Sequence, residues 1–97
     1  MNVIDVLRTE YPGDDAWQRF VDVFRPAWEG WQEKNLYAKE LGDEEIAMVL
    51  TTSMGSRSQD WFNQACKALG GRVPSDVLLN EPLGKQIVRT LLMRMPR

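Results

Sequence analysis

The sequence contains no histidine and a single cysteine, Cys66. Histidine is the commonest general base and the usual nitrogen ligand for metals, so its absence removes Ser-His and Cys-His catalysis and the familiar zinc sites. One thiol cannot form an internal disulfide, and such cysteine usage favours a reducing compartment such as the cytoplasm. We therefore expect a cytoplasmic protein that is not an enzyme and that holds no cofactor and no metal.

Long apolar runs are also missing. The uninterrupted apolar stretches are a few residues long, far short of the roughly 20 residues that cross a bilayer. The first residues, Met1-Asn2-Val3, show no basic region followed by an apolar run, so they do not indicate a secretory signal. No segment sustains the period-two alternation of a strand. A chain of 97 residues is the size of one domain, and we expect it to be all-α without membrane association.

The net charge is only −2, but the charge is unevenly distributed. Residues 1–50 carry eleven acidic and five basic side chains, whereas residues 51–97 carry three acidic and seven basic ones. A basic final helix could approach an anionic groove or a nucleic acid. Cations near a helix C-terminus also complement the helix dipole without any partner. Both interpretations remain open, although a pI near 5.1 argues against dominant non-specific DNA binding.

Capping residues predict the helices of the N-terminal half. Asn2 caps a helix that extends to about Glu10, and Asp14 caps a second one. Pro26 interrupts the second helix, which must kink or restart there. Asp43 caps a third helix, and the acidic clusters at residues 14–15 and 43–45 are better explained by capping than by a metal ion.

Large aromatic side chains recur at helical spacing between Trp17 and Trp31. Such a stripe is more often part of a core than of a docking surface. Trp28 and Trp31 lie beyond the proline and next to Gly30, so we expect them to be partly exposed and to form a secondary interface.

The C-terminal half is punctuated by glycine and proline. Residues 51–56 predict a loop, after which Ser58 begins a helix that extends to Leu69 and ends at Gly70-Gly71. Pro74 fits the first position of a short helix that ends near residue 79.

Asn80 is expected to cap the final helix, with Pro82 in its opening turn. Its apolar stripe consists of residues at a spacing of four, widened by two neighbours. The fold class that follows is an all-α, single-domain helical bundle of about five to six short helices. The stripe residues are Leu83, Ile87, Leu91 and Met95, with Val88 and Leu92 beside them.

A DNA-binding function is an alternative, because residues 43–64 loosely follow a helix-turn-helix pattern. A working motif needs a tight turn and a second helix that presents polar and basic side chains to the groove. Here the connecting loop is long, and the second helix carries Trp61 and Phe62. The cations that could contact nucleic acid are Arg57, Lys67 and Arg72.

From Ser58 to Met95 the order and spacing of several elements resemble the toxin-binding domain of the Xre/MbcA/ParS-type antitoxins. The elements are a tryptophan-bearing helix, a double glycine after leucine, a proline-initiated leucine-rich helix, and a glycine near the start of the last helix. In this sequence they are Trp61-Phe62, Leu69-Gly70-Gly71, Val73-Pro74, Val77-Leu78-Leu79, Gly84, Val88 and Leu91-Leu92.

The resemblance implies that the protein binds and neutralises a toxin of the RES type, which consumes NAD. In that family the C-terminal region typically covers the toxin's active-site cleft, so residues 58–97 would form the toxin-binding segment. Residues 1–57 would be a helical region for packing or dimerisation, or a degenerate helix-turn-helix. The partner-binding residues carried over by position are Arg89, Met93, Arg94, Met95 and Arg97.

The chain departs from the family pattern in three respects. Val73 stands where Ser or Thr is expected before Pro74, the glycine-containing ending is missing, and no clear DNA-binding domain precedes the segment. Two other functions therefore remain open: a small DNA-associated transcriptional regulator, and a stand-alone adaptor, such as a phage encodes, with an unrelated protein partner.

Overall fold

The computed structural model describes residues 2–30, 39 and 43–95, and in these ranges every regular element is helical. The expected all-α fold is confirmed. The α-helices are α1 (Val3–Thr9), α2 (Asp14–Glu29), α4 (Glu44–Met54), α5 (Ser58–Phe62), α6 (Pro74–Asn80) and α7 (Gly84–Arg94), and the 3-10 turns are η1 (Gly55–Arg57) and η2 (Lys67–Leu69).

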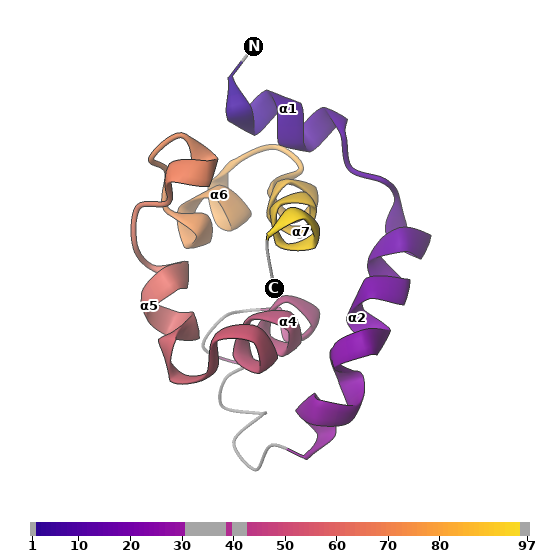
Figure 1. The fold of residues 1–97 in the computed structure, drawn as a ribbon. Coiled ribbons are helices and arrows are strands. Elements are labelled where there is room, and N and C mark those ends of the chain that lie inside the picture. Colours follow the sequence, from indigo (N-terminus) through magenta and orange to yellow (C-terminus); the bar gives the residue numbers. More distant parts are fainter. Residues whose placement is uncertain (1, 31–38, 40–42, 96–97) are drawn as a thin grey trace.

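Helix α7 lies in the middle of the molecule, and the other helices surround it (Figure 1). Because it has neighbours on several sides, its buried positions form a wide band rather than a narrow stripe. Helix α1, from the N-terminal region, packs directly on α7, and α2 packs on α4. The two halves of the chain thus share one core, and the radius of gyration is 12.7 Å. The buried residues of α7 are Gly84, Ile87, Val88, Thr90, Leu91 and Leu92.

Helix α2 continues through Pro26 instead of restarting there. Trp17, Val21 and Trp28 are all buried, so core packing stabilises the helix on both sides of the proline. The expected exposure of Trp28 is therefore wrong, since only 1% of this residue is accessible. Trp31 lies outside the described residues.

Local capping rules give mixed results. The side chains of Asn2 and Asp43 accept hydrogen bonds from backbone amides of α1 and α4, as expected. Asp14 is instead the first residue of α2, and its carboxylate accepts from the Tyr11 hydroxyl at 2.7 Å. Gly13 is the N-cap, with a φ of 103° that a side chain would oppose.

The loop expected at residues 51–56 is wrong, because α4 extends to Met54 and is followed directly by η1. Thr51 is fully buried, and the Thr52 hydroxyl donates to the carbonyl of Met48 at 2.7 Å. Threonine disfavours helix interiors when its hydroxyl competes for the backbone, but here the i−4 carbonyl satisfies Thr52 inside the helix.

The helix expected from Ser58 to Leu69 is shorter, because α5 ends at Phe62 and a separate turn, η2, precedes the glycines. Gly70 and Gly71 have φ values of 66° and 86°, so their expected role in reversing the chain is confirmed. The reversal is closed by an amide of Cys66 donating to the Arg72 carbonyl at 2.9 Å.

Pro74 begins α6 as expected, but Asn80 is the last residue of α6 and does not cap α7. The N-cap of α7 is Leu83, which has a left-handed φ of 56° and is 57% exposed, so it does not belong to the buried stripe. The short connection must bring α7 tightly against α6, and this requirement overrides the local capping pattern.

Gly84 makes the close approach of α6 and α7 possible. A Cβ at this position would lie 2.1 Å from the carbonyl oxygen of Val77 and 2.7 Å from that of Leu78. Both obstacles are backbone atoms of a packed helix, so they cannot move aside cheaply. Within the described ranges, no helix is both long enough and apolar enough to cross a membrane.

We predict that Gly84→Ala lowers the free energy of unfolding by about 2–3 kcal/mol, because the methyl group forces the two helices apart. Urea denaturation followed by circular dichroism measures the loss. Gly30→Ala is the matched control, since among the described residues its Cβ would meet only the Ala27 carbonyl, at an ordinary 3.5 Å. Equal stability of the two variants would show that α6 and α7 are not tightly packed.

Candidate partner-binding surface

Arg89 sits at the centre of a polar network between α7, α4 and the start of α2. Its guanidinium donates to a carboxylate oxygen of Glu45 and to the Tyr11 hydroxyl, each at 3.1 Å, and lies 3.5 Å from Asp14. It also stands over the Trp17 ring, 5.0 Å from its centroid. Only 12% of the Arg89 side chain is exposed.

Arg89 was expected to contact a partner, but its charged group is used within the fold. The sequence shows a cation on the final helix without showing that this face meets Glu45 and Trp17. To bind a second protein, the guanidinium would have to leave these partners, and the partly buried carboxylate of Glu45 would lose its cation. The geometry thus gives Arg89 a structural role.

We predict that Arg89→Ala lowers the free energy of unfolding by about 2–3 kcal/mol, because Glu45 and Tyr11 lose a buried charged partner. Arg25→Ala removes an exposed ion pair with Asp22 and should change stability by about 0.5 kcal/mol or less. Chemical denaturation of both variants checks the contrast. If Arg89→Ala lowers the free energy of unfolding no more than Arg25→Ala does, the polar network around Arg89 does not stabilise the fold.

Tyr11 is the residue of this network whose ionisation can be followed. Burial, together with the hydrogen bond to Asp14, raises the pKa of Tyr11 above its ordinary value of 10.0, and Arg89 partly opposes the rise. The folded state thus retains the proton that the unfolded state loses. The stabilisation is complete below pH 10 and declines as the pH rises toward the folded-state pKa.

We predict that Tyr11→Phe makes the stability of the protein less sensitive to pH above 10, because the residue with the raised pKa is gone. Denaturation midpoints at several alkaline pH values test this, and tyrosinate absorbance of both proteins identifies the Tyr11 titration. If wild type and variant lose stability in parallel, the raised pKa of Tyr11 is not coupled to folding.

The last turn of α7, taken together with its C-cap Met95, holds three further residues expected to bind a partner. Met93 and Met95 are half-buried and pack against the core. Arg94 is 48% exposed and pairs with Glu10, which is 51% exposed. Arg97 lies outside the described residues. The structure therefore brings Met93, Arg94 and Met95 together at one end of α7, with Arg94 the most accessible.

The cations considered for nucleic-acid contact lie on separate elements. Arg57 is in η1, Lys67 is in η2, and α5 lies between them in the chain. Arg72 pairs with Asp76 at 2.8 Å and holds the pKa of that carboxyl below its usual value. The second helix of the loose helix-turn-helix, α5, has five residues and buries its Phe62. This arrangement does not provide a basic recognition helix.

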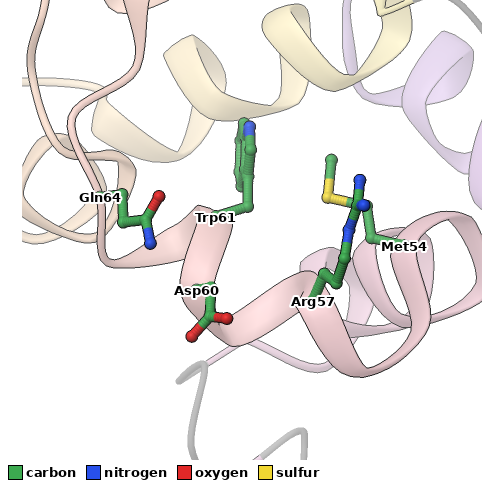
Figure 2. A pocket seen from close by; sticks show the side chains of 5 residues that line it. All are labelled: Met54, Arg57, Asp60, Trp61 and Gln64. Carbon is green, nitrogen blue, oxygen red and sulfur yellow. The ribbon is translucent and has the colours of Figure 1, made fainter.

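A cleft of about 370 Å³ lies where α4, η1 and α5 meet. Figure 2 shows Trp61 on one side, with Met54 and Arg57 on the other. Sequence reasoning missed this cleft because it placed Met54 in a loop, considered Arg57 only for contact with nucleic acid and used Trp61 only as an element of the family pattern. The extension of α4 to Met54 is what brings these side chains together. The lining residues are Met54, Arg57, Asp60, Trp61 and Gln64.

A small helical scaffold with an exposed cation between half-buried methionines at one helix end, and a cleft beside α5, has the features of a protein-binding domain. Residues 41–96, more than half of the chain, match the family model of the antitoxin Xre/MbcA/ParS C-terminal toxin-binding domain. The chain belongs to this family and is an antitoxin whose partner is a protein toxin. No curated protein and no solved structure matches it.

The matched segment confirms the resemblance noted in the sequence and extends it toward the N-terminus. It begins at residue 41 and thus includes α4, which supplies one wall of the cleft. Both the last turn of α7 and all the residues that line the cleft lie within it.

Proposed function

We propose that this antitoxin neutralises a RES-type, NAD-consuming toxin through the last turn of α7 and the chain end that follows. The observation that carries the proposal is the match of residues 41–96 to a toxin-binding domain. Arg94, with Arg97 beyond it, would contact the toxin, and Met93 and Met95 would supply apolar contact beside them. The protein would act as a stoichiometric inhibitor in the cytoplasm and not as an enzyme.

The electrostatics of Arg94 support this function. Its pair with Glu10 joins two half-exposed side chains, and such surface pairs contribute only about 0–1 kcal/mol. The guanidinium can therefore exchange Glu10 for an acidic group of the toxin at little cost. A guanidinium keeps its charge and binds carboxylates through two parallel hydrogen bonds, which suits a contact with an acidic group of the toxin.

The test uses the product of the open reading frame adjacent to the antitoxin gene, with NAD loss as the readout. Wild-type antitoxin should stop NAD loss completely at a fixed molar ratio of antitoxin to toxin. We predict that Arg94→Glu needs about 10-fold more protein for half-inhibition, because the reversed charge would repel the acidic group that Arg94 is proposed to contact. Arg19→Glu makes the same charge change on an exposed position of α2 and should inhibit like wild type.

Two results would contradict the proposal in different ways. An adjacent gene product that leaves NAD intact would exclude the RES type. Full inhibition by Arg94→Glu, in a variant whose thermal unfolding matches wild type, would exclude the last turn of α7 as the inhibitory element.

A further inference from the structure

The cleft between α4 and α5 contains polar groups that the rest of the fold does not use. Arg8, Arg72 and Arg89 each pair with carboxylates. Arg57 is exposed and makes neither a hydrogen bond nor an ion pair within the described residues. The Trp61 indole N–H likewise has no acceptor among them, whereas that of Trp17 donates to Glu45 at 3.0 Å.

The side chains that line the cleft differ in direction. Figure 2 shows Trp61, Met54 and Arg57 pointing to the same side of the backbone, toward α7, while Asp60 points away from them. On the side toward which Trp61 points, the cleft is lined by an indole face, a thioether and a guanidinium, with the Gln64 amide at its edge. The lining holds one cation, Arg57, and one acid, Asp60, and of the two only Arg57 points to the side of Trp61.

This chemistry suits one kind of occupant. A flat aromatic ring can stack on the Trp61 indole, with the Met54 sulfur at the ring edge. The Arg57 guanidinium can lie over the same ring or bind a carboxylate next to it. A volume of about 370 Å³ is large enough for one such side chain and its flanking backbone, and anchors of this type dominate many protein interfaces.

We propose that the cleft receives an aromatic side chain flanked by an acidic residue, presented by the toxin. The charge of Arg57 complements the acid, and all the lining residues belong to the matched toxin-binding segment. The inference rests on the proposed function and adds a second contact area to the last turn of α7. The proposed occupant of the cleft is a segment of the toxin and not a free nucleotide.

The first experiment follows the indole N–H resonance of Trp61 in the isotope-labelled full chain, assigned by its absence in Trp61→Leu. A capped Asp-Phe-Asp tripeptide should shift this resonance saturably, whereas Asp-Ala-Asp and Lys-Phe-Lys should not. Arg57→Gln should weaken the binding at least about 5-fold, and Lys67→Gln, which removes an exposed cation outside the cleft, should not. Equal shifts with all three peptides, or AMP binding more tightly than the acidic aromatic peptide, would overturn the proposal.

The second experiment measures neutralisation of the toxin by the same variants. Arg57→Gln and Trp61→Leu should need about 10-fold more protein for half-inhibition, and Lys67→Gln should match wild type. Arg57 is exposed, so its substitution keeps the test valid if Trp61→Leu fails to fold.

The results separate the two proposals. Wild-type potency of Arg57→Gln, together with loss in Arg94→Glu, would overturn the cleft and leave the proposed function intact. Absence of neutralisation by wild type would overturn the proposed function, and the peptide titration would then decide the chemistry of the cleft alone.

Discussion

The position of α7 depends on the carboxylate of Glu45. Its two oxygens accept from Arg89 at 3.1 Å, from Trp17 at 3.0 Å and from Gln18 at 2.6 Å, so that side chains from α2, α4 and α7 meet at one group. Apolar packing is non-directional and would tolerate small rotations of these helices. A partly buried ion pair with its hydrogen bonds tolerates them less, because each lost partner leaves a polar group unsatisfied. The network therefore fixes which face of α7 remains outside.

Gly84 imposes a second constraint at the start of the same helix. Its Cα lies so close to the end of α6 that no side chain fits, and the left-handed Leu83 before it completes the tight connection. Helix α7 is thus held at its first turn by backbone contact and at its middle by Arg89. The last turn, with Arg94 in a weak surface pair, is the part that can exchange its contacts with a partner.

The local rules of the sequence predicted those features that depend on a few neighbouring residues. The caps at Asn2 and Asp43, the start of α6 at Pro74 and the glycine reversal at Gly70 are of this kind. The predictions failed where distant contacts decide. Burial of Trp28, the continuation of α4 through Thr51 and the start of α7 after Leu83 all follow from packing against other helices.

In the candidate site too, some features could be predicted from the sequence and others depend on distant contacts. The last turn of α7 could be selected from the sequence by the family resemblance, and its partner contacts remain predictions. The inward orientation of Arg89 could not be foreseen, since it depends on a carboxylate 44 positions away. The cleft was also beyond sequence reasoning, because it exists only if α4 extends to Met54 and a short turn follows.

The uneven charge of the chain has an explanation that differs from both sequence interpretations. Lys85, Arg89 and Arg94 of α7 pair with Asp43, Glu45 and Glu10, which all belong to the acidic half. The two halves neutralise each other inside one molecule, so the basic final helix is neither a free cationic surface nor only a match to its own dipole. Recognition by charge is then left to cations with weak or no internal partners. Among the described residues these include Arg94 and Arg57, one at each of the two proposed toxin contacts.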